Sequence, residues 1–79
     1  MLTLLADADK VIGVKQTKKA LNAKLAKKVF VSLNADPAIR DAIAELAMSA
    51  NVETVEVDTM EALGRACGIS VGAACAAIV

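Results

Sequence analysis

The pattern of hydrophobic and polar positions changes period several times along the chain, which predicts alternating strands and helices. Four short runs are apolar or alternate with period two, as strands do: residues 11–14, 28–33, 54–57 and 73–79. Apolar residues recur at helical spacing in three segments between them: residues 15–24, 37–50 and 59–67. In the first of these segments, Ala20 and Leu21 are expected to face the core. A further short helix is predicted over residues 1–8.

Residues typical of helix ends set limits for these helices. Asp36 is a favourable N-cap, and Pro37 suits the first position of a helix. Asp58, with Glu61 three residues later, resembles a capping box that starts the next helix. Gly68 stands where a left-handed residue is wanted at a helix C-terminus.

The segment 28–33 carries apolar side chains on both faces, which is typical of a central strand covered by helices on either side. The alternating elements then predict an α/β fold, a three-layer α/β/α sandwich around one four-stranded sheet. A chain of 79 residues has room for one core, so we assign residues 1–79 to a single domain. Strand order and the direction of the last strand do not follow from the pattern.

The composition argues against several classes of function. Phe30 is the one aromatic residue, so the chain has no set of aromatic side chains on which bases could stack. It has no histidine, no phosphate-binding glycine loop and no hydrolase motif, and we therefore expect neither enzyme activity nor a cofactor. Cys67 and Cys75 lie among apolar residues and are interpreted as buried thiols, because a structural zinc site needs four ligands.

The two ends of the sequence bear on localisation. Residues 1–6 are apolar but lack the basic stretch that begins a signal peptide. The apolar run at 71–79 is too short to cross a bilayer and is interpreted as a buried strand. We expect a reduced, cytoplasmic setting and no membrane partner.

Charge is divided unevenly, although nine Lys/Arg and nine Asp/Glu give a net charge of zero. Residues 1–40 hold eight Lys/Arg against three Asp, whereas residues 41–79 hold one Arg against six Asp/Glu. This asymmetry suggests a polyanionic partner for the basic half. The alternative is that folding interleaves the two halves and pairs their charges internally.

The stretch GVKQTKKAL begins at Gly13 and places three lysines, Lys15, Lys18 and Lys19, at the start of a predicted helix. A helix start carries partial positive charge, so cations are disfavoured there unless an anion is close. Amide groups, lysines and Gln16, which can read a base edge, together make a candidate anion site. Ordinary solvated lysines are an equally weighted alternative, because basic runs are weak motifs.

The second stretch of interest, GISVG, follows the last predicted helix. Ile69 and Val71 flank Ser70 in a short loop, where an exposed apolar side chain can form a contact surface. The residue types favour the other interpretation, in which one or both apolar side chains anchor the loop to the core.

Together, GVKQTKKAL, the helix headed by ADP and the C-terminal EALGRACGISVGAACAAIV resemble the kink-turn-binding ribosomal protein family, the L-seven-Ae group. The chain is most similar to small stand-alone bacterial members of the YbxF and YlxQ type, over about residues 5–79. The segment LGRACGISVGAACAAI is the most specific part, because it joins helix, loop and last strand in the family's order. The resemblance implies a three-layer α/β/α sandwich with a mixed four-stranded sheet.

Members of this family bind kink-turns, RNA helices bent sharply at a three-nucleotide bulge beside sheared G·A pairs. The resemblance implies two groups of RNA-binding residues: Gly13, Lys15, Gln16, Lys18 and Lys19, then Gly68, Ile69, Ser70 and Val71. Lys15 and Gln16 would meet the sheared guanines, and Lys19 would support that contact or hold a phosphate. The second group would cover the extruded nucleotide. Many relatives carry Asn-Glu in place of Lys15-Gln16, and many have Glu in place of Ser70.

The resemblance therefore implies a small, monomeric RNA-binding protein that recognises and stabilises kink-turns without catalysis. Ribosomal RNA and riboswitch-type RNA are candidate targets, and no metal is expected. Two alternatives remain. One is a structural ribosomal component with no separable activity, and the other is a protein-interaction module that uses the acidic residues between Glu53 and Glu61.

Overall fold

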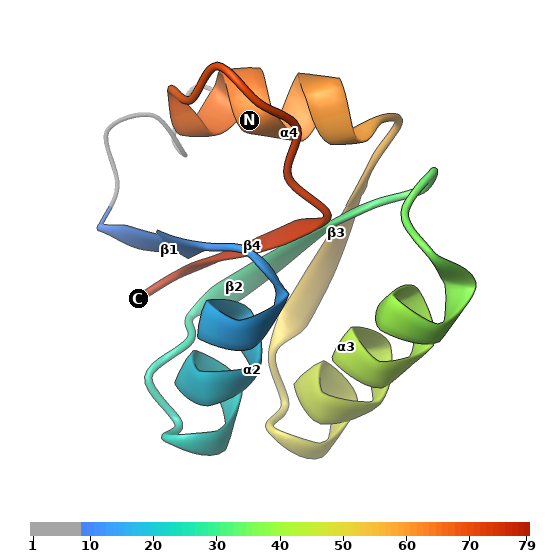
Figure 1. Ribbon diagram of the computed structural model, residues 1–79. Coiled ribbons are helices and arrows are strands. Elements are labelled where there is room, and N and C mark those ends of the chain that lie inside the picture. The colour runs from blue at the N-terminus through green and yellow to red at the C-terminus, as the bar shows by residue number, and fades with distance from the viewer. Residues whose placement is uncertain (1–8) are drawn as a thin grey trace.

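In the computed structural model, which describes residues 9–79, strands and helices alternate as the pattern predicts (Figure 1). The strands are β1 (Lys10–Ile12), β2 (Lys28–Ser32), β3 (Glu53–Val57) and β4 (Cys75–Ile78). The helices are α2 (Val14–Asn22), α3 (Pro37–Ser49) and α4 (Met60–Cys67). The helix predicted over residues 1–8 lies outside the described residues.

The four strands form one mixed sheet in the order β1-β4-β2-β3. β2 and β3 are parallel, and Phe30 lies opposite Val55. β4 runs antiparallel to both of its neighbours, with Ala76 opposite Ile12 of β1 on one side and Phe30 of β2 on the other. The last strand of the chain therefore inserts between the first two described strands. This confirms the mixed sheet that the resemblance implies and supplies the strand order.

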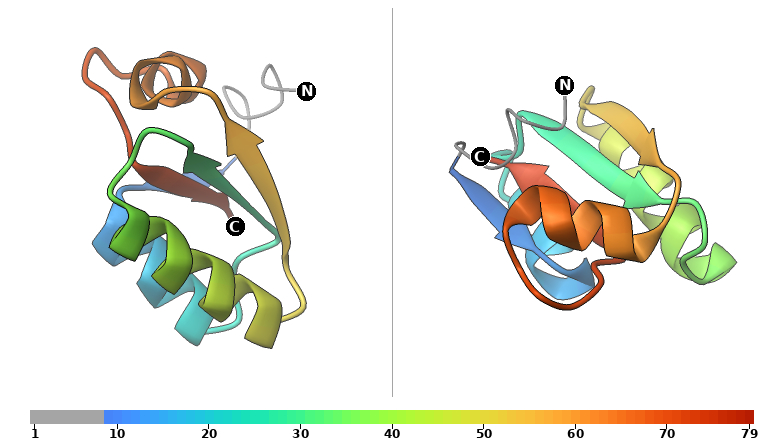
Figure 2. Two further views of the ribbon diagram at one scale, coloured as in Figure 1. Left: turned by 90° about the vertical axis from the view of Figure 1, so that its right-hand side faces the viewer. Right: turned by 90° about the horizontal axis from the view of Figure 1, so that it is seen from above.

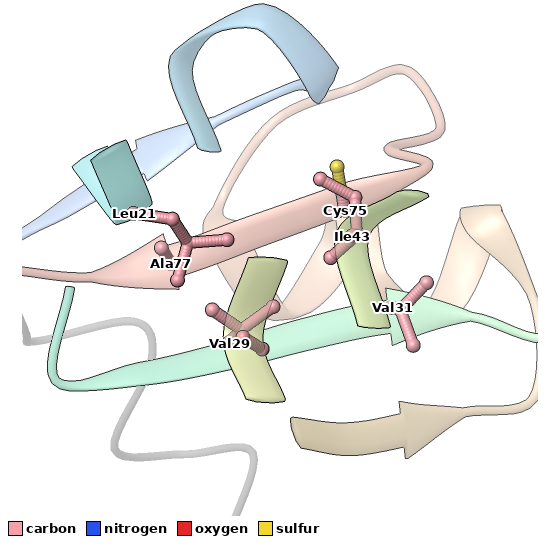
Figure 3. Packing of buried hydrophobic residues seen from close by; sticks show 7 residues of the cluster. Leu21, Val29, Val31, Ile43, Cys75 and Ala77 are labelled. Atoms are coloured by element: carbon pink, nitrogen blue, oxygen red, sulfur yellow. The ribbon is translucent and has the colours of Figure 1, made fainter. Parts of the chain in front are cut away.

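Helices cover both faces of the sheet, with α2 and α3 on one side and α4 on the other (Figures 1 and 2). The core beneath α2 and α3 consists of Leu21, Val29, Val31, Ile43, Ala47, Cys75 and Ala77 (Figure 3). The core beneath α4 consists of Phe30, Val57, Leu63, Cys67, Ala73 and Ala76. Neighbouring strand residues alternate between these cores because successive side chains point to opposite faces. The predicted three-layer sandwich is confirmed.

Small side chains in β4 explain how a chain with one aromatic residue fills its core. Cys75, Ala76 and Ala77 are all 0% exposed. β4 lies inside the sheet with helices above and below it, so small side chains let those helices approach closely and keep the interior dense.

Of the two predicted helix N-caps, one is confirmed and the other is wrong. Asp36 caps α3 as predicted, and its carboxylate accepts a hydrogen bond from the Ala38 amide at 2.8 Å. The capping box predicted at Asp58 is wrong, because Thr59 is the N-cap of α4 and its hydroxyl accepts from the Ala62 amide at 3.0 Å. Thr59 has the extended backbone that a cap requires (φ −140°, ψ 158°), so the helix begins one residue later than predicted.

Three strands are shorter than predicted, and β2 differs least because it ends at Ser32 rather than at residue 33. β1 ends at Ile12 rather than at residue 14, since the chain already enters α2 at Val14. β4 begins at Cys75 rather than at residue 73, because the Ala73 amide donates to the Met60 carbonyl of α4 at 2.9 Å. Long-range hydrogen bonds thus set strand limits that apolar character leaves open.

Candidate functional site

One edge of the sheet gathers the starts of all three described helices. β1, β2 and β3 run in the same direction, and β4 runs in the opposite one. Consequently, the ends of the first three strands and the start of β4 share an edge, and α2, α3 and α4 all begin there (Figures 1 and 2). The loop that leads from α4 into β4 must reach the same edge.

Gly13 joins β1 to α2 at this edge. Its backbone has φ 101° and ψ 163°, a conformation that a side chain would disfavour, and it allows the strand to turn directly into the helix. Its amide donates to the Cys75 carbonyl at 2.8 Å, which ties the start of α2 to the start of β4. Within the described residues, no side chain caps α2, and its first turn has no acidic residue.

Helical spacing decides which residues of α2 face outward. Thr17, Ala20 and Leu21 are buried against the sheet, and the predicted inward direction of Ala20 and Leu21 is confirmed. The predicted RNA-binding residues lie on the remaining faces: Lys15, Gln16 and Lys19 are exposed, and Lys18 is half-buried. The three lysines, with Asn22 and Ala23, line a shallow hollow on the outer surface of α2.

The charges of these lysines are not neutralised within residues 9–79. None of Lys15, Lys18 and Lys19 lies within 4.0 Å of a carboxylate oxygen in this part of the chain. Interleaving of the basic and acidic halves therefore does not compensate the start of α2. The prediction that all three lysines lie at the helix start is wrong, because α2 begins at Val14, Lys15 lies in its first turn and Lys19 lies in its last. A helix start with a positive side chain and free amide groups still favours an anion.

The second group of predicted site residues forms the loop after α4. Gly68 ends the helix in the left-handed conformation (φ 83°, ψ 22°), as predicted. Ile69 packs against the core beneath α4, whereas Ser70 is exposed and Val71 is 68% exposed. Each interpretation of this loop thus holds for one residue: Ile69 anchors it, and Val71 presents an apolar side chain to solvent.

A buried glycine that sequence reasoning missed sets the position of this loop. Gly64 lies in α4 directly beneath the loop, and a Cβ atom added there would be 3.1 Å from the Val71 carbonyl carbon and 3.2 Å from the Gly72 Cα. The Ile69 amide also donates to the Gly64 carbonyl at 3.0 Å. The missing side chain lets the loop backbone rest on the helix.

Two polar side chains that sequence reasoning also missed form hydrogen bonds just after the loop and at the start of α4. The Ser32 hydroxyl is buried and donates to the Ala73 carbonyl at 2.6 Å. The Asn34 side chain accepts a hydrogen bond from the Met60 amide, at the start of α4, at 2.8 Å. Ser32 is the last residue of β2, a run of apolar residues, and Asn34 follows that strand. The hydrogen-bond partners of both side chains lie far along the chain. No local pattern would have identified them.

The Gly13–Cys75 hydrogen bond brings the two groups of site residues to one edge. Cys75 is separated from the loop ending at Gly72 by two alanines, and it bonds to the residue that starts the lysine-rich helix. The fold thus places a positively charged helix and an exposed loop at the same end of the strands, with α2 below the sheet and the loop above it in Figure 1.

Other kinds of site have few candidates in the described part of the chain. Burial raises the pKa of the Cys67 and Cys75 thiols and outweighs the opposing effects of Lys10 on the first and of Thr17 and Lys18 on the second. Both therefore remain neutral thiols rather than nucleophiles at neutral pH. Residues 9–79 contain no group of three His, Cys, Asp or Glu residues placed to hold a metal ion. No helix among them is long and apolar enough to span a membrane.

Comparison with known proteins gives a consistent result. The family model described as "Ribosomal protein L7Ae/L30e/S12e/Gadd45 family" matches residues 2–79. An RNA-binding protein of Geobacillus sp. (strain WCH70) is 49% identical, and the match covers 87% of this chain and 84% of that protein. RNA-binding protein YbxF of Geobacillus stearothermophilus is 46% identical over the same shares. Large ribosomal subunit protein eL8 of Halobacterium salinarum is 40% identical, over 85% of this chain and 57% of its own length.

Solved structures share the same fold. The Giardia lamblia 15.5kD RNA binding protein superimposes with a TM-score of 0.88 at 29% identity, covering 98% of this chain and 68% of that one. A Bacillus halodurans protein described as having unknown function also reaches 0.88, at 22% identity, over 98% of this chain and 81% of its own. The second likeness shows the fold alone.

Proposed function

The chain belongs to the ribosomal protein L7Ae/L30e/S12e/Gadd45 family, and from this premise we propose that it is an RNA-binding protein that recognises kink-turns in structured RNA and stabilises their bent form. The relatives named above as RNA-binding proteins support RNA as the partner. The kink-turn is the more specific part of the proposal, and it follows from the similarity of the two site stretches to the kink-turn-binding family.

The observation that carries the proposal is the uncompensated positive start of α2. Lys15 is exposed there and Lys19 is exposed in the last turn, no described carboxylate pairs with either, and no side chain among residues 9–79 caps the helix. A lysine in the first turn, as Lys15 is, raises the free energy of the isolated protein, because it adds to the positive end of the helix dipole. A bound phosphate backbone removes that penalty, which supports a local anion site on a protein of zero net charge.

The proposed contacts divide between bases and backbone. Lys15 and Gln16 read the edges of the guanines in the sheared pairs, since an amide side chain both donates and accepts hydrogen bonds. Lys19 holds a phosphate beside them. Val71, exposed on a loop that Ile69 anchors, covers the unpaired nucleotide and loses contact with water as it does so.

The proposed mechanism is a shift of population and involves no covalent chemistry. A flexible RNA interconverts between extended and kinked forms, and a protein that binds the kinked form more tightly increases its share. The zero net charge keeps long-range attraction to other nucleic acids weak, so that the local basic surface acts mainly on an RNA whose shape fits.

The test is a binding titration with a kink-turn duplex labelled at both ends for energy transfer. A second duplex, in which Watson–Crick pairs replace the G·A pairs, is titrated at the same salt and magnesium concentrations. We expect binding and folding of the first duplex alone. Equal, weak binding to both would mean that the lysines provide generic phosphate affinity and that the kink-turn is not the ligand.

Substitutions then test the residues. Lys15→Ala and Gln16→Ala should each weaken binding of the kinked duplex by about 1–3 kcal/mol, the range of a good base-edge contact. Lys28→Ala is the matched control, because Lys28 pairs with Glu53 at 3.5 Å and lies at the start of β2, outside the proposed site. If both site variants bind as tightly as the control, the assignment of these residues is wrong even if the chain binds kink-turns.

A further inference from the structure

Lys24 and Lys27 are among the lysines of the basic half that lie outside the site described above. Residues 10–35 contain seven lysines and neither Asp nor Glu. Lys24 and Lys27 are exposed in the turn that joins α2 to β2, and neither forms an ion pair with another described residue. The next residue, Lys28, differs because Glu53 pairs with it at 3.5 Å. The turn therefore carries two uncompensated charges beside one compensated charge.

The backbone of Lys24 has an unusual conformation. Each of the three described helices ends with the same pair of hydrogen bonds, which requires a left-handed residue just beyond the helix. That residue is Gly68 after α4 (φ 83°) and Asn51 after α3 (φ 57°), and these two residue types tolerate the conformation best. After α2 it is Lys24 (φ 60°), whose amide donates to the Leu21 carbonyl at 3.1 Å.

Local energetics thus favour glycine or asparagine at position 24, yet the chain has lysine there. The side chain of Lys24 is exposed, so it gains no core packing that would offset the strained backbone. What lysine provides that asparagine and glycine do not is a positive charge on a long, mobile stem. Residues held in a costly backbone conformation often serve a function.

We propose that Lys24 and Lys27 form a second phosphate-contact site, which holds the backbone of an RNA stem lying along α2. This inference rests on the proposed function and extends its binding surface from the start of α2 to the turn beyond its end. The nine residues of α2 span about 13 Å. Each strand of a duplex carries roughly one phosphate per 3.4 Å of its axis, so about four phosphates of one strand lie along this length. That is more than Lys15, Lys18 and Lys19 can contact.

The two sites have different roles. Phosphate contacts position an RNA without reading its sequence, so the second site should add affinity for any adequately long stem. Recognition of the kink stays with the start of α2 and the loop after α4. The second site should therefore change the salt dependence of binding and leave the preference for the kinked duplex unchanged.

Salt dependence measures the number of phosphate contacts directly. The slope of log affinity against log salt changes by about 0.9 for each phosphate contact on the scale of duplex DNA. Changing both residues, Lys24→Gln with Lys27→Gln, should make the slope shallower by about 1.8. Over a rise from 50 to 200 mM salt, the difference in affinity between parent and variant should then shrink by about 12-fold.

Two further variants control for folding and for loss of charge in general. Lys24→Gly should raise the melting temperature, because glycine relieves the left-handed strain, and yet it should make the slope shallower by about 0.9. Reduced binding by a more stable protein cannot be attributed to misfolding. Lys28→Gln removes a lysine that Glu53 already compensates and should leave the slope unchanged.

The measurements use the kink-turn duplex and its Watson–Crick control, both with extended stems. A double variant whose slope equals that of Lys28→Gln would overturn the second site while leaving the kink-turn proposal intact. A parent that binds both duplexes equally, with a shallower slope in the double variant, would overturn the kink-turn proposal and support the phosphate site. Failure of the parent chain to bind either RNA would overturn both.

Discussion

Replacing Gly64 with alanine brings two effects of opposite sign into competition. Gly64 is inside α4 and buried, and the backbone of Val71 and Gly72 crosses over it. Helix propensity by itself predicts that alanine stabilises the protein by about 0.8–1.0 kcal/mol. The tertiary structure predicts the reverse, because the new Cβ would overlap the Val71 carbonyl oxygen and lie 3.1 Å from its carbon.

The size of the effect follows from what the new methyl group meets. All three neighbouring atoms belong to backbone, so no change of side-chain rotamer can relieve the contact. Overpacking of this kind typically costs about 1–3 kcal/mol, and a direct overlap with backbone belongs in the upper half of that range. Subtracting the gain in helix propensity leaves a net loss of about 1–2 kcal/mol. For a domain of this size, that is about 4–16 °C in melting temperature.

Thermal and urea unfolding followed by circular dichroism measure this loss. Arg65→Ala, an exposed neighbour in the same helix, is the matched control and should stay within about 0.5 kcal/mol of the parent. Because Gly64→Ala must displace the loop that carries Val71, its affinity for the kinked duplex should also fall. A Gly64→Ala protein more stable than the parent would show that the loop does not rest on this helix, and the reasoning from the contact would be wrong.

Two further predictions concern local features. Thr59→Ala should destabilise the protein by about 1 kcal/mol in urea unfolding, since it removes the cap of α4, while Asp58→Ala should cost less than half of that; the opposite order would restore Asp58 as the cap. The raised pKa of Cys67 and Cys75 means that the folded protein holds the thiol protons more tightly than the unfolded chain does. Their contribution is therefore complete at neutral pH and is lost as pH rises beyond the ordinary thiol pKa of about 8.5. Unfolding midpoints measured from pH 7 to 10 should fall, and less steeply in a variant with alanine at both positions; identical profiles would contradict this.

Local interactions made much of the fold predictable. Helical spacing placed Ala20 and Leu21 on the buried face of α2, and the side-chain cap at Asp36 and the left-handed Gly68 lie where the sequence indicates. Each of these features depends on residues within about one helical turn, which a sequence pattern can represent. Lys15 and Lys19 of α2 are exposed for the same reason, although their role in RNA binding stays a prediction.

Features that depend on distant partners were missed. The Ser32 hydroxyl bonds to a carbonyl 41 residues away, and the Asn34 side chain bonds to an amide 26 residues away. Gly64 owes its importance to a loop that folds back over it. In each case the sequence shows a small or polar residue without its partner, so the residue type alone does not indicate the role.

By itself, the sequence determined the order of strands and helices, the buried face of α2 and the concentration of lysines between Lys10 and Lys28. Only the tertiary structure decided that β4 inserts antiparallel between β1 and β2, which brings the start of α2 and the loop after α4 to one edge. It also decided which lysines are compensated, because Lys28 meets Glu53 across the parallel register of β2 and β3, whereas Lys24 meets no described acid. The physical reason is that hydrophobic period shows which face of an element is buried, but the neighbour that covers it is chosen by packing among residues far apart in the chain.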